Sequence, residues 1–298
     1  MDYFPQTDLR PSTKQLYNRQ LQRWLALYPE GTSPSVIYNN PYDAIQRLRR
    51  HLQTTDSDKK SVLHRFITTI LGFRKYHPSQ CSVNWTIYTQ WKKALDLSFA
   101  EISQYRQQNQ PAPSLQEKEG IHMTMKEIEE IRDSLPNSLT RLLIAFYTLI
   151  PPVRADYGMV HLCDFGETPL TPNFIYTNDE MSCMKLTDFK TSDKYKEIVQ
   201  RLPERLHRWL RESLQEHPRA FLFVNRYNQP FTRPHFSAWA NEKLSSIFSK
   251  TFTLTLFRHI FLSELPKDIT VEERQRISQL MGHSIAVQLT YQWNEERD

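Results

Sequence analysis

The chain has 298 residues, of which 39% are hydrophobic and 12% aromatic, enough for a packed core and roughly two domains of ordinary size. Its formal net charge of +5 and isoelectric point near 9.0 favour a polyanionic partner such as nucleic acid. With only six glycines and no glycine-rich phosphate loop, a nucleotide-dependent motor or dehydrogenase is disfavoured.

The cysteines and apolar runs indicate the compartment. Cys81, Cys163 and Cys183 are scattered without a C-x-x-C pair, which fits a reducing intracellular environment and argues against a disulfide framework or zinc finger. The apolar run 142–150 is far shorter than the ~18 residues that a membrane span needs. The N-terminus lacks a signal-peptide pattern. We expect a non-secreted protein without a membrane span, cofactor or metal, in either nucleus or cytoplasm.

Residues 1–106 are expected to form a helical DNA-binding domain. Apolar side chains at helical spacing predict a helix over 13–27 and another that begins near Asp58. Asn40-Pro41 is typical of an N-cap followed by proline at the first helical position. A fourth helix is predicted from about residue 84 to residue 106. Together these elements predict a compact all-α module.

The charge is unevenly placed along the chain. Residues 1–120 contain 16 Lys and Arg against 10 Asp and Glu, whereas the remainder contains 22 against 23. A basic N-terminal part is the electrostatic pattern of a protein that binds a polyanion. The plainer alternative is that a modest positive charge only improves solubility.

A break separates this module from the rest of the chain. Residues 107–121 contain two prolines, many glutamines and a glycine, which predicts an exposed linker. The second domain is expected over 122–298. It opens with a capping box at Thr124 and Glu127, ahead of the first apolar stripe.

The second domain is predicted to be mostly helical with one small antiparallel sheet. Thr270 and Glu273 form a second capping box, and Gly282 suits the end of a helix. Short strands are predicted over 173–177, 181–187 and 195–200, and helices over 138–150, 234–248, 255–265, 270–281 and 284–292.

Four residues of this domain suit the cleavage of a phosphodiester without a metal. Arg154 and Arg258 can fork two donors onto the non-bridging oxygens, where charge develops in the transition state. His283 can add a hydrogen bond. Tyr291 can attack phosphorus and form a covalent ester, which conserves the bond energy for rejoining. Taken singly, each has a plainer interpretation: a solvated arginine, a packed or capping histidine, or a core tyrosine.

The leaving 5′-oxygen needs a proton, and Lys190 is the candidate donor. It lies in a turn predicted between two strands, from which a lysine can reach the groove beside the scissile phosphate. Lys194 and Lys196 are rivals for this role. A lysine that only contacts phosphate or solvent is the alternative for all three.

These segments together resemble the catalytic domain of the tyrosine recombinases, the phage-integrase family. The resemblance covers residues 122–293 and is carried by TLIPPVRADYGMVHL, the Lys190-Thr191 pair, LTLFRHIFLSEL and QLMGHSIAVQLTYQW. It implies that Arg154 and Arg258 bind phosphate, that Lys190 is the general acid, that His283 donates a hydrogen bond and that Tyr291 is the nucleophile. The N-terminal module is similar to the family's core-binding domain. The wording PPVRADY looks most like recombinases of large eukaryotic DNA viruses and their mobile elements.

The resemblance implies a site-specific recombinase or integrase that works without a metal. Such an enzyme cleaves and rejoins double-stranded DNA through a 3′-phosphotyrosyl intermediate and a Holliday junction, as a homo-tetramer on two DNA sites. The two domains would clamp the DNA as a C shape. Two alternatives stay open: a type IB topoisomerase, which works as a monomer, and a non-catalytic DNA-binding protein with this fold.

The chain departs from the family pattern in three places. Thr255 stands where the family usually has a histidine, and threonine cannot shuttle a proton at neutral pH; His259 is a substitute only if it faces the site. His283 and Tyr291 are eight positions apart, one fewer than is common. The chain ends seven residues after Tyr291, too few for the further helix that docks into a neighbouring protomer. We therefore expect tetramer contacts elsewhere, or a truncated chain.

Overall fold

The computed structural model describes residues 2–5, 7–53, 59–107, 123–266 and 268–292. The chain divides into two compact units, Met1–Gln108 and Asn109–Asp298. Of the predicted linker, residues 108–121 lie outside the described residues. The prediction of a mainly helical protein with a small sheet is confirmed. Among the described residues, no helix combines the length and apolar character needed to cross a membrane.

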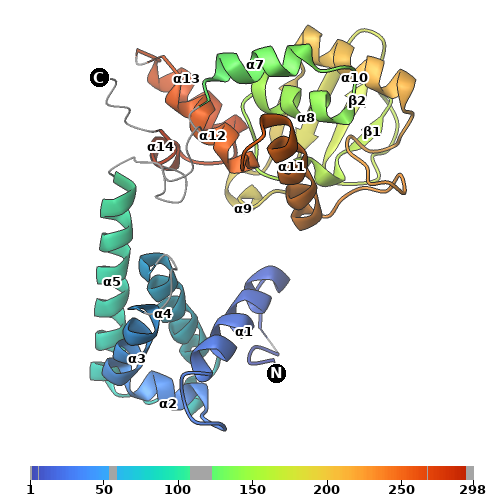
Figure 1. Ribbon diagram of the computed structural model, residues 1–298. Coiled ribbons are helices and arrows are strands. Elements are labelled where there is room, and N and C mark those ends of the chain that lie inside the picture. The colour runs from blue at the N-terminus through green and yellow to red at the C-terminus, as the bar shows by residue number, and fades with distance from the viewer. Residues whose placement is uncertain (1, 6, 54–58, 108–122, 267, 293–298) are drawn as a thin grey trace. The chain divides into compact units, whose positions relative to one another are not determined.

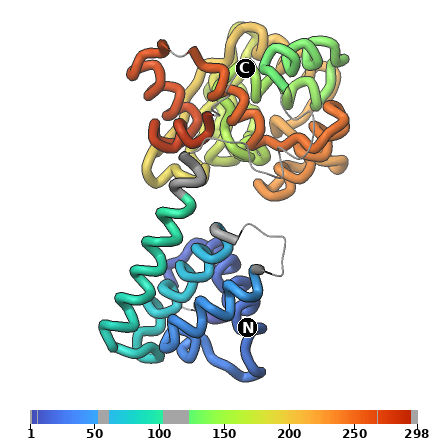
Figure 2. Tube along the Cα trace, turned by 60° about the vertical axis from the view of Figure 1, so that its left-hand side comes forward, coloured from blue at the N-terminus to red at the C-terminus, as the bar shows by residue number. Residues whose placement is uncertain are grey.

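The first unit is a bundle of helices around a central one (Figure 2). Its elements are α1 (Pro11–Leu25), α2 (Pro34–Asn39), α3 (Pro41–Gln53), α4 (Lys59–Tyr76), the 3₁₀ turn η1 (Pro78–Gln80) and α5 (Trp85–Gln107). Proline occupies the first position of α1, α2 and α3, where its missing N–H costs no helical hydrogen bond. The central helix, α4, packs against α1, α2, α3 and α5.

Aromatic side chains make up much of the core of this unit. Trp24 of α1 packs edge-on against Phe66 of α4, with ring centroids 5.0 Å apart, and against Trp91 of α5 at 5.8 Å. The indole Nε1 of Trp91 donates to the backbone oxygen of Tyr38 at 2.8 Å, which satisfies a buried donor and ties α5 to α2.

The second unit surrounds its sheet with helices. Its helical elements are α7 (Met125–Ser134), α8 (Leu139–Thr148), η2 (Asp156–Met159), α9 (Ser192–Tyr195), α10 (Glu204–Glu216), α11 (Arg233–Phe248), α12 (Leu254–Ser263), α13 (Val271–Leu280) and α14 (Ile285–Leu289). Its strands are β1 (His161–Cys163), β2 (Phe174–Thr177), β3 (Ser182–Leu186) and β4 (Ile198–Arg201). The capping box at Thr124 and Glu127 is present, and the Thr270 side chain caps α13.

The sheet is mixed, so the expectation of a purely antiparallel sheet is wrong in one pair. The strand order is β1-β2-β3-β4. The pairs β2–β3 and β3–β4 are antiparallel, as predicted. β1 was not predicted and pairs parallel with β2, with His161 opposite Phe174. The segment 164–173 returns the chain to the end of the sheet at which β1 begins. The two strands therefore run in the same direction.

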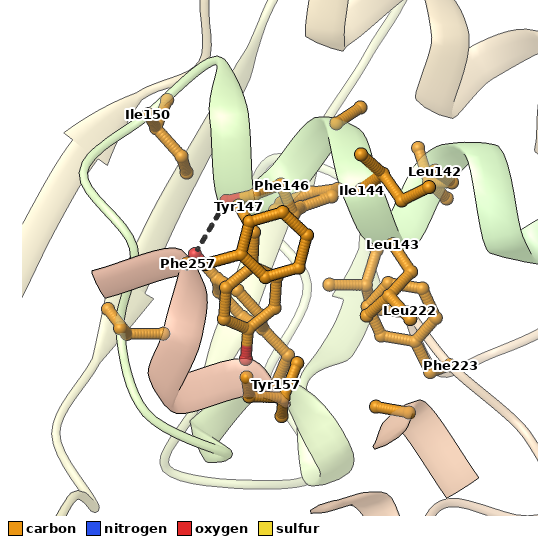
Figure 3. Close-up of a cluster of buried hydrophobic side chains, with 14 of the residues drawn as sticks. Leu142, Leu143, Ile144, Phe146, Tyr147, Ile150, Tyr157, Leu222, Phe223 and Phe257 are labelled. Atoms are coloured by element: carbon orange, nitrogen blue, oxygen red, sulfur yellow. Dashed lines mark hydrogen bonds between the residues drawn. The ribbon is translucent and has the colours of Figure 1, made fainter. Parts of the chain in front are cut away.

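The core of the second unit fixes the segment that leads to Arg154. Tyr147 and Phe146 of α8 are fully buried and pack against Tyr157 of η2 at 5.4 Å and 5.2 Å between ring centroids. The hydroxyl of Tyr157 donates to the Phe146 oxygen at 3.4 Å (Figure 3). The chain between α8 and η2 is therefore held from both ends by aromatic packing.

The last three helices, α12, α13 and α14, are grouped at one end of the second unit (Figure 1). Thr253, Thr270 and Ser284 cap their N-termini, each accepting a hydrogen bond from the backbone N–H three residues later. Between α13 and α14 the backbone of Gly282 adopts φ +66, a left-handed conformation that suits glycine. This turn brings His283 and Tyr291 back toward α12.

Candidate active site

Arg258 is at the centre of the site. It lies on α12, its residue is 1% exposed, and its Nη1 donates to the backbone oxygens of Pro152 at 2.7 Å and Met281 at 3.3 Å. One guanidinium thus joins the segment before Arg154 to the segment before His283. Its Nε and Nη2 atoms are buried and make no hydrogen bond of good geometry among the described residues, although the Tyr291 phenol is close enough to interact with this guanidinium. Buried donors of this kind are usually satisfied, so these two suit an anionic ligand.

The side chain of Arg154 also reaches this site, from the segment between α8 and η2. It follows α8 and Pro151-Pro152, and its backbone oxygen accepts a hydrogen bond from the buried Tyr147 hydroxyl at 2.6 Å. Its side chain is half-buried, and Nη1 donates to the Gly282 oxygen at 3.4 Å. Arg154 is therefore held at its backbone by the core and at its side chain by the turn before His283.

His283 is buried beside both arginines. Its Nδ1 lies 3.2 Å from the Ser284 oxygen, and since a carbonyl only accepts, Nδ1 carries the hydrogen. Burial, reinforced by the charge of Arg258, lowers the pKa of His283 to about 3, so the ring is neutral at pH 7. Its buried Nε2, which has no partner in the described part of the chain, then carries a lone pair. Donation to phosphate requires a proton to arrive at this nitrogen.

Tyr291 follows α14 and packs between these groups. Its ring stacks on that of His283 with centroids 5.8 Å apart, and the Arg258 guanidinium carbon lies 4.9 Å from its centroid. Burial by itself would raise the pKa of Tyr291, but the charges of Arg258 and Arg154, together with hydrogen bonding from these two side chains to the phenol, outweigh it and lower the pKa below the usual 10.0. A phenol that ionises more readily is a better nucleophile.

Lys190 is exposed in the connection between β3 and β4, just before α9. Its two neighbours in sequence reach the turn beside His283. The Thr191 hydroxyl donates to the Gly282 oxygen at 2.6 Å, and the Phe189 ring lies against Gly282. The backbone of Lys190 is thereby anchored next to the site. The rival Lys194 instead has its ammonium 5.3 Å from the Tyr195 ring centroid.

Two residues of α12, Thr255 and His259, bear on the proton transfer for which a histidine was expected at position 255. Thr255 lies one turn before Arg258 and its side chain is exposed. His259 was a candidate only if its side chain faces the site, and the structure shows that it does. Its Nδ1 lies 2.8 Å from the backbone oxygen of Tyr291, and the centroids of the two rings are 4.8 Å apart. Burial, partly offset by that hydrogen bond, lowers the pKa of His259.

Asp156 is an acidic residue of this region that the sequence analysis did not single out. Its side chain is 4% exposed and pairs with Arg233 Nε at 2.9 Å. Burial raises the pKa of Asp156 although Arg233, Arg154 and Arg258 all act to lower it. The available signal was an acidic residue two positions after Arg154, in a segment otherwise rich in buried side chains.

The structure thus brings Arg154, Arg258, His283 and Tyr291 together, with Lys190 anchored nearby. Among the described residues, no cluster of His, Cys, Asp and Glu side chains is arranged to hold a metal ion.

Comparison with known proteins gives a likeness in structure but none in sequence. No protein-family model matches the sequence, and no curated protein is significantly similar to it. Among solved structures, the chain is similar to a crystal structure of XerA recombinase, with a TM-score of 0.43 and 13% identity over 97% of this chain and 89% of that one. At this score and identity, the likeness does not transfer residue roles to this chain.

Proposed function

We propose that this chain is a DNA strand transferase of the tyrosine recombinase type, with Tyr291 as its nucleophile. The observation that carries the proposal is the surroundings of the Tyr291 ring. The phenol lies beside two arginines that lower its pKa, and the buried Nε and Nη2 of Arg258 make no hydrogen bond of good geometry among the described residues. A phosphate oxygen would satisfy these donors and bring phosphorus to the phenol.

In the proposed reaction, the Tyr291 oxygen attacks phosphorus and the bond from phosphorus to the 5′-oxygen breaks. The products are a 3′-phosphotyrosyl ester and a 5′-hydroxyl strand, whose new proton comes from the Lys190 ammonium. Arg154 and Arg258 bind the non-bridging oxygens, where negative charge grows. Rejoining is the reverse attack by a 5′-hydroxyl, so neither a metal nor an external energy source is required.

Thr255 does not prevent this reaction if the phenol loses its proton to solvent. The lowered pKa of Tyr291 makes that loss easier, because two positive charges stabilise the phenolate. His283 contributes once the bound phosphate raises its pKa and a proton arrives at Nε2. The phosphate charge acts in the opposite direction to that of Arg258, which holds the His283 pKa down in the unbound chain.

We assign a recombinase rather than a topoisomerase because residues 122–293 and the N-terminal helical module resemble those of the tyrosine recombinases. The partner is double-stranded DNA, and the assembly is a tetramer on two DNA sites. Membership of the group found in large eukaryotic DNA viruses and mobile elements rests on residues 151–157 and on the short interval between His283 and Tyr291. A topoisomerase would relax supercoiled DNA that lacks a target site, whereas a recombinase would require that site.

The test is a covalent-adduct assay. The chain is mixed with nicked duplexes from the DNA that flanks its own gene, denatured, and examined for protein that stays attached. We expect an adduct with the parent chain and none with Tyr291→Phe, which removes only the hydroxyl.

DNA affinity is the control, because the hydroxyl acts in chemistry rather than in binding. Tyr291→Phe is expected to bind the duplex within about threefold of the parent, well under the tenfold that 1.4 kcal/mol represents. A Phe variant that still forms the adduct would remove Tyr291 from the role. Tight binding without any adduct by the parent would favour the non-catalytic alternative.

A further inference from the structure

The segment that carries Tyr291 has little helical structure of its own to hold it. α14 spans only Ile285–Leu289, and the Tyr291 backbone N–H donates to Gln288 at 3.0 Å in a terminal turn. So short a helix is marginal by itself, because nucleation is costly. The orientation of the Tyr291 ring must therefore depend on contacts with other elements.

Two of the hydrogen bonds that supply such contacts reach α12, and a longer one comes from α13, where Arg274 Nη1 donates to Gln292 Oε1 at 3.4 Å. His259 Nδ1 lies 2.8 Å from the Tyr291 backbone oxygen, and Gln292 Nε2 donates to the Leu262 oxygen at 2.9 Å. The α12 residues that grip the segment are one position and four positions after Arg258. The element that holds the phosphate-binding arginine therefore also holds the tyrosine.

The hydrogen-bond roles at His259 are fixed by its partner. A backbone oxygen only accepts, so Nδ1 must carry the hydrogen. The neutral Nδ1–H form and the doubly protonated form both satisfy this requirement. The contact therefore survives titration of the ring, and what it does for the Tyr291 segment is mechanical.

We propose that His259 is a positioning residue, which holds the Tyr291 phenol between Arg154 and Arg258 by gripping the Tyr291 backbone oxygen through Nδ1–H. This inference rests on the proposed function of Tyr291. It assigns His259 a task different from the proton transfer for which Thr255 is unsuited. His259 also packs its ring 4.8 Å from that of Tyr291, so the grip acts on both backbone and side chain.

The first test uses the geometry of amide side chains. His259→Asn keeps an N–H donor near the place of Nδ1, whereas His259→Gln places its donor near Nε2, and His259→Ala removes both. Adduct formation is expected to stay within about tenfold of the parent in the Asn variant. It is expected to fall by roughly 10²-fold in the Gln and Ala variants, the loss that a misplacement of about 1 Å produces. Equal rates in the Asn and Gln variants would overturn the proposal.

The second test bypasses the tyrosine. In a Tyr291→Phe background, hydrogen peroxide can serve as the nucleophile: its anion attacks phosphorus and the 5′-hydroxyl strand leaves. Adding His259→Ala to this background should leave the peroxide-driven rate unchanged, because no tyrosine remains to be positioned. A matching loss of the peroxide-driven rate would show that His259 acts on the phosphate site itself, and would overturn the proposal.

The third test needs no DNA and so separates this inference from the proposed function. A 3-fluorotyrosine placed at residue 291 reports ionisation of its phenol by ¹⁹F NMR. Removing the grip in His259→Ala should move the phenol away from the arginines and raise its pKa, while His259→Asn should not. Identical titrations in the parent and His259→Ala would overturn the positioning role even if the parent formed adducts. If the parent formed none, a raised pKa in His259→Ala would still support it.

Discussion

The connection that carries Lys190 is fastened by residues on either side of the lysine. Phe189 is buried against Gly282, and Thr191 donates to the Gly282 oxygen. Lys190 itself projects from this anchored backbone and is exposed. A lysine that projects from an anchored backbone beside a phosphate site can reach a leaving oxygen, which suits a general acid.

We expect Lys190→Ala to slow cleavage by roughly 10²- to 10⁴-fold, the usual contribution of a positioned general acid. Substrates with sulfur in place of the 5′-bridging oxygen should restore most of this loss, because a thiolate leaves without a proton. The measurement is the single-turnover rate of adduct formation on the oxygen and sulfur substrates.

Lys194→Ala and Lys196→Ala are the matched controls. Both should cleave the oxygen substrate at close to the parent rate if Lys190 is the acid. A sulfur-rescued defect in either of them, with Lys190→Ala unaffected, would transfer the role to that rival.

The turn between α13 and α14 is the element on which the site converges. The Gly282 oxygen accepts from Arg154 at 3.4 Å and from Thr191 at 2.6 Å, and its neighbour Met281 accepts from Arg258 at 3.3 Å. A Cβ at Gly282 would lie 3.2 Å from the Phe189 ring, closer than ordinary contact. Both the left-handed backbone and the available space therefore call for glycine.

Gly282→Ala should lower the free energy of unfolding by about 1–2 kcal/mol, the cost of the left-handed conformation for a residue with a Cβ. It should also slow adduct formation, because displacement of the turn or of Phe189 disturbs Arg154 and the Lys190 connection. Urea unfolding and the adduct assay measure the two effects.

Gly166→Ala provides the comparison. Gly166 also has a positive φ, +96, but a Cβ there meets nothing within 4 Å. This variant should lose stability without losing cleavage in the folded fraction. If both variants kept full cleavage, the turn would not control the site.

At the scale of helices and strands, local sequence signals predicted most elements. They did not predict very short elements or the pairing of strands that are distant in sequence. Capping residues such as Thr124 and Thr270 act within one turn, so the sequence displays them directly. α2 has six residues and β1 has three, too few for a periodic pattern to emerge. The parallel pairing of β1 with β2 depends on the path of residues 164–173, which composition does not determine.

The residues of the candidate site could be predicted from the sequence, but the orientation and protonation of its histidines could not. The sequence singled out Arg154, Arg258, His283 and Tyr291, which the structure brings together, although their roles stay predictions. The inward orientation of His259 depends on where the segment after α14 lies, and the position of that segment is set by tertiary contacts with α12. The protonation of His283 likewise depends on burial, which a motif does not display.

At the scale of the whole chain, the net positive charge lies in the first 120 residues, which contain 16 Lys and Arg against 10 Asp and Glu. In the first unit, Arg74, Lys75 and Lys92 line one cavity between α4 and α5, together with Tyr88. The Arg74 guanidinium carbon lies 4.7 Å from the Tyr88 ring centroid, so this cation is ordered against an aromatic face. An ordered group of cations on a helical module is a suitable surface for backbone phosphates.

DNA affinity should therefore fall steeply with salt, because each neutralised phosphate releases condensed counterions. In a plot of log affinity against log salt for the full chain, Lys92→Ala should reduce the slope by about 1 and weaken all duplexes alike. Lys126→Ala, a lysine of the second unit whose ammonium lies 3.9 Å from Glu130, is the matched control and should leave the slope unchanged. A flat response in the parent would contradict phosphate binding by the basic module. Equal slopes in the parent and Lys92→Ala would instead place the contacts on another face of the molecule.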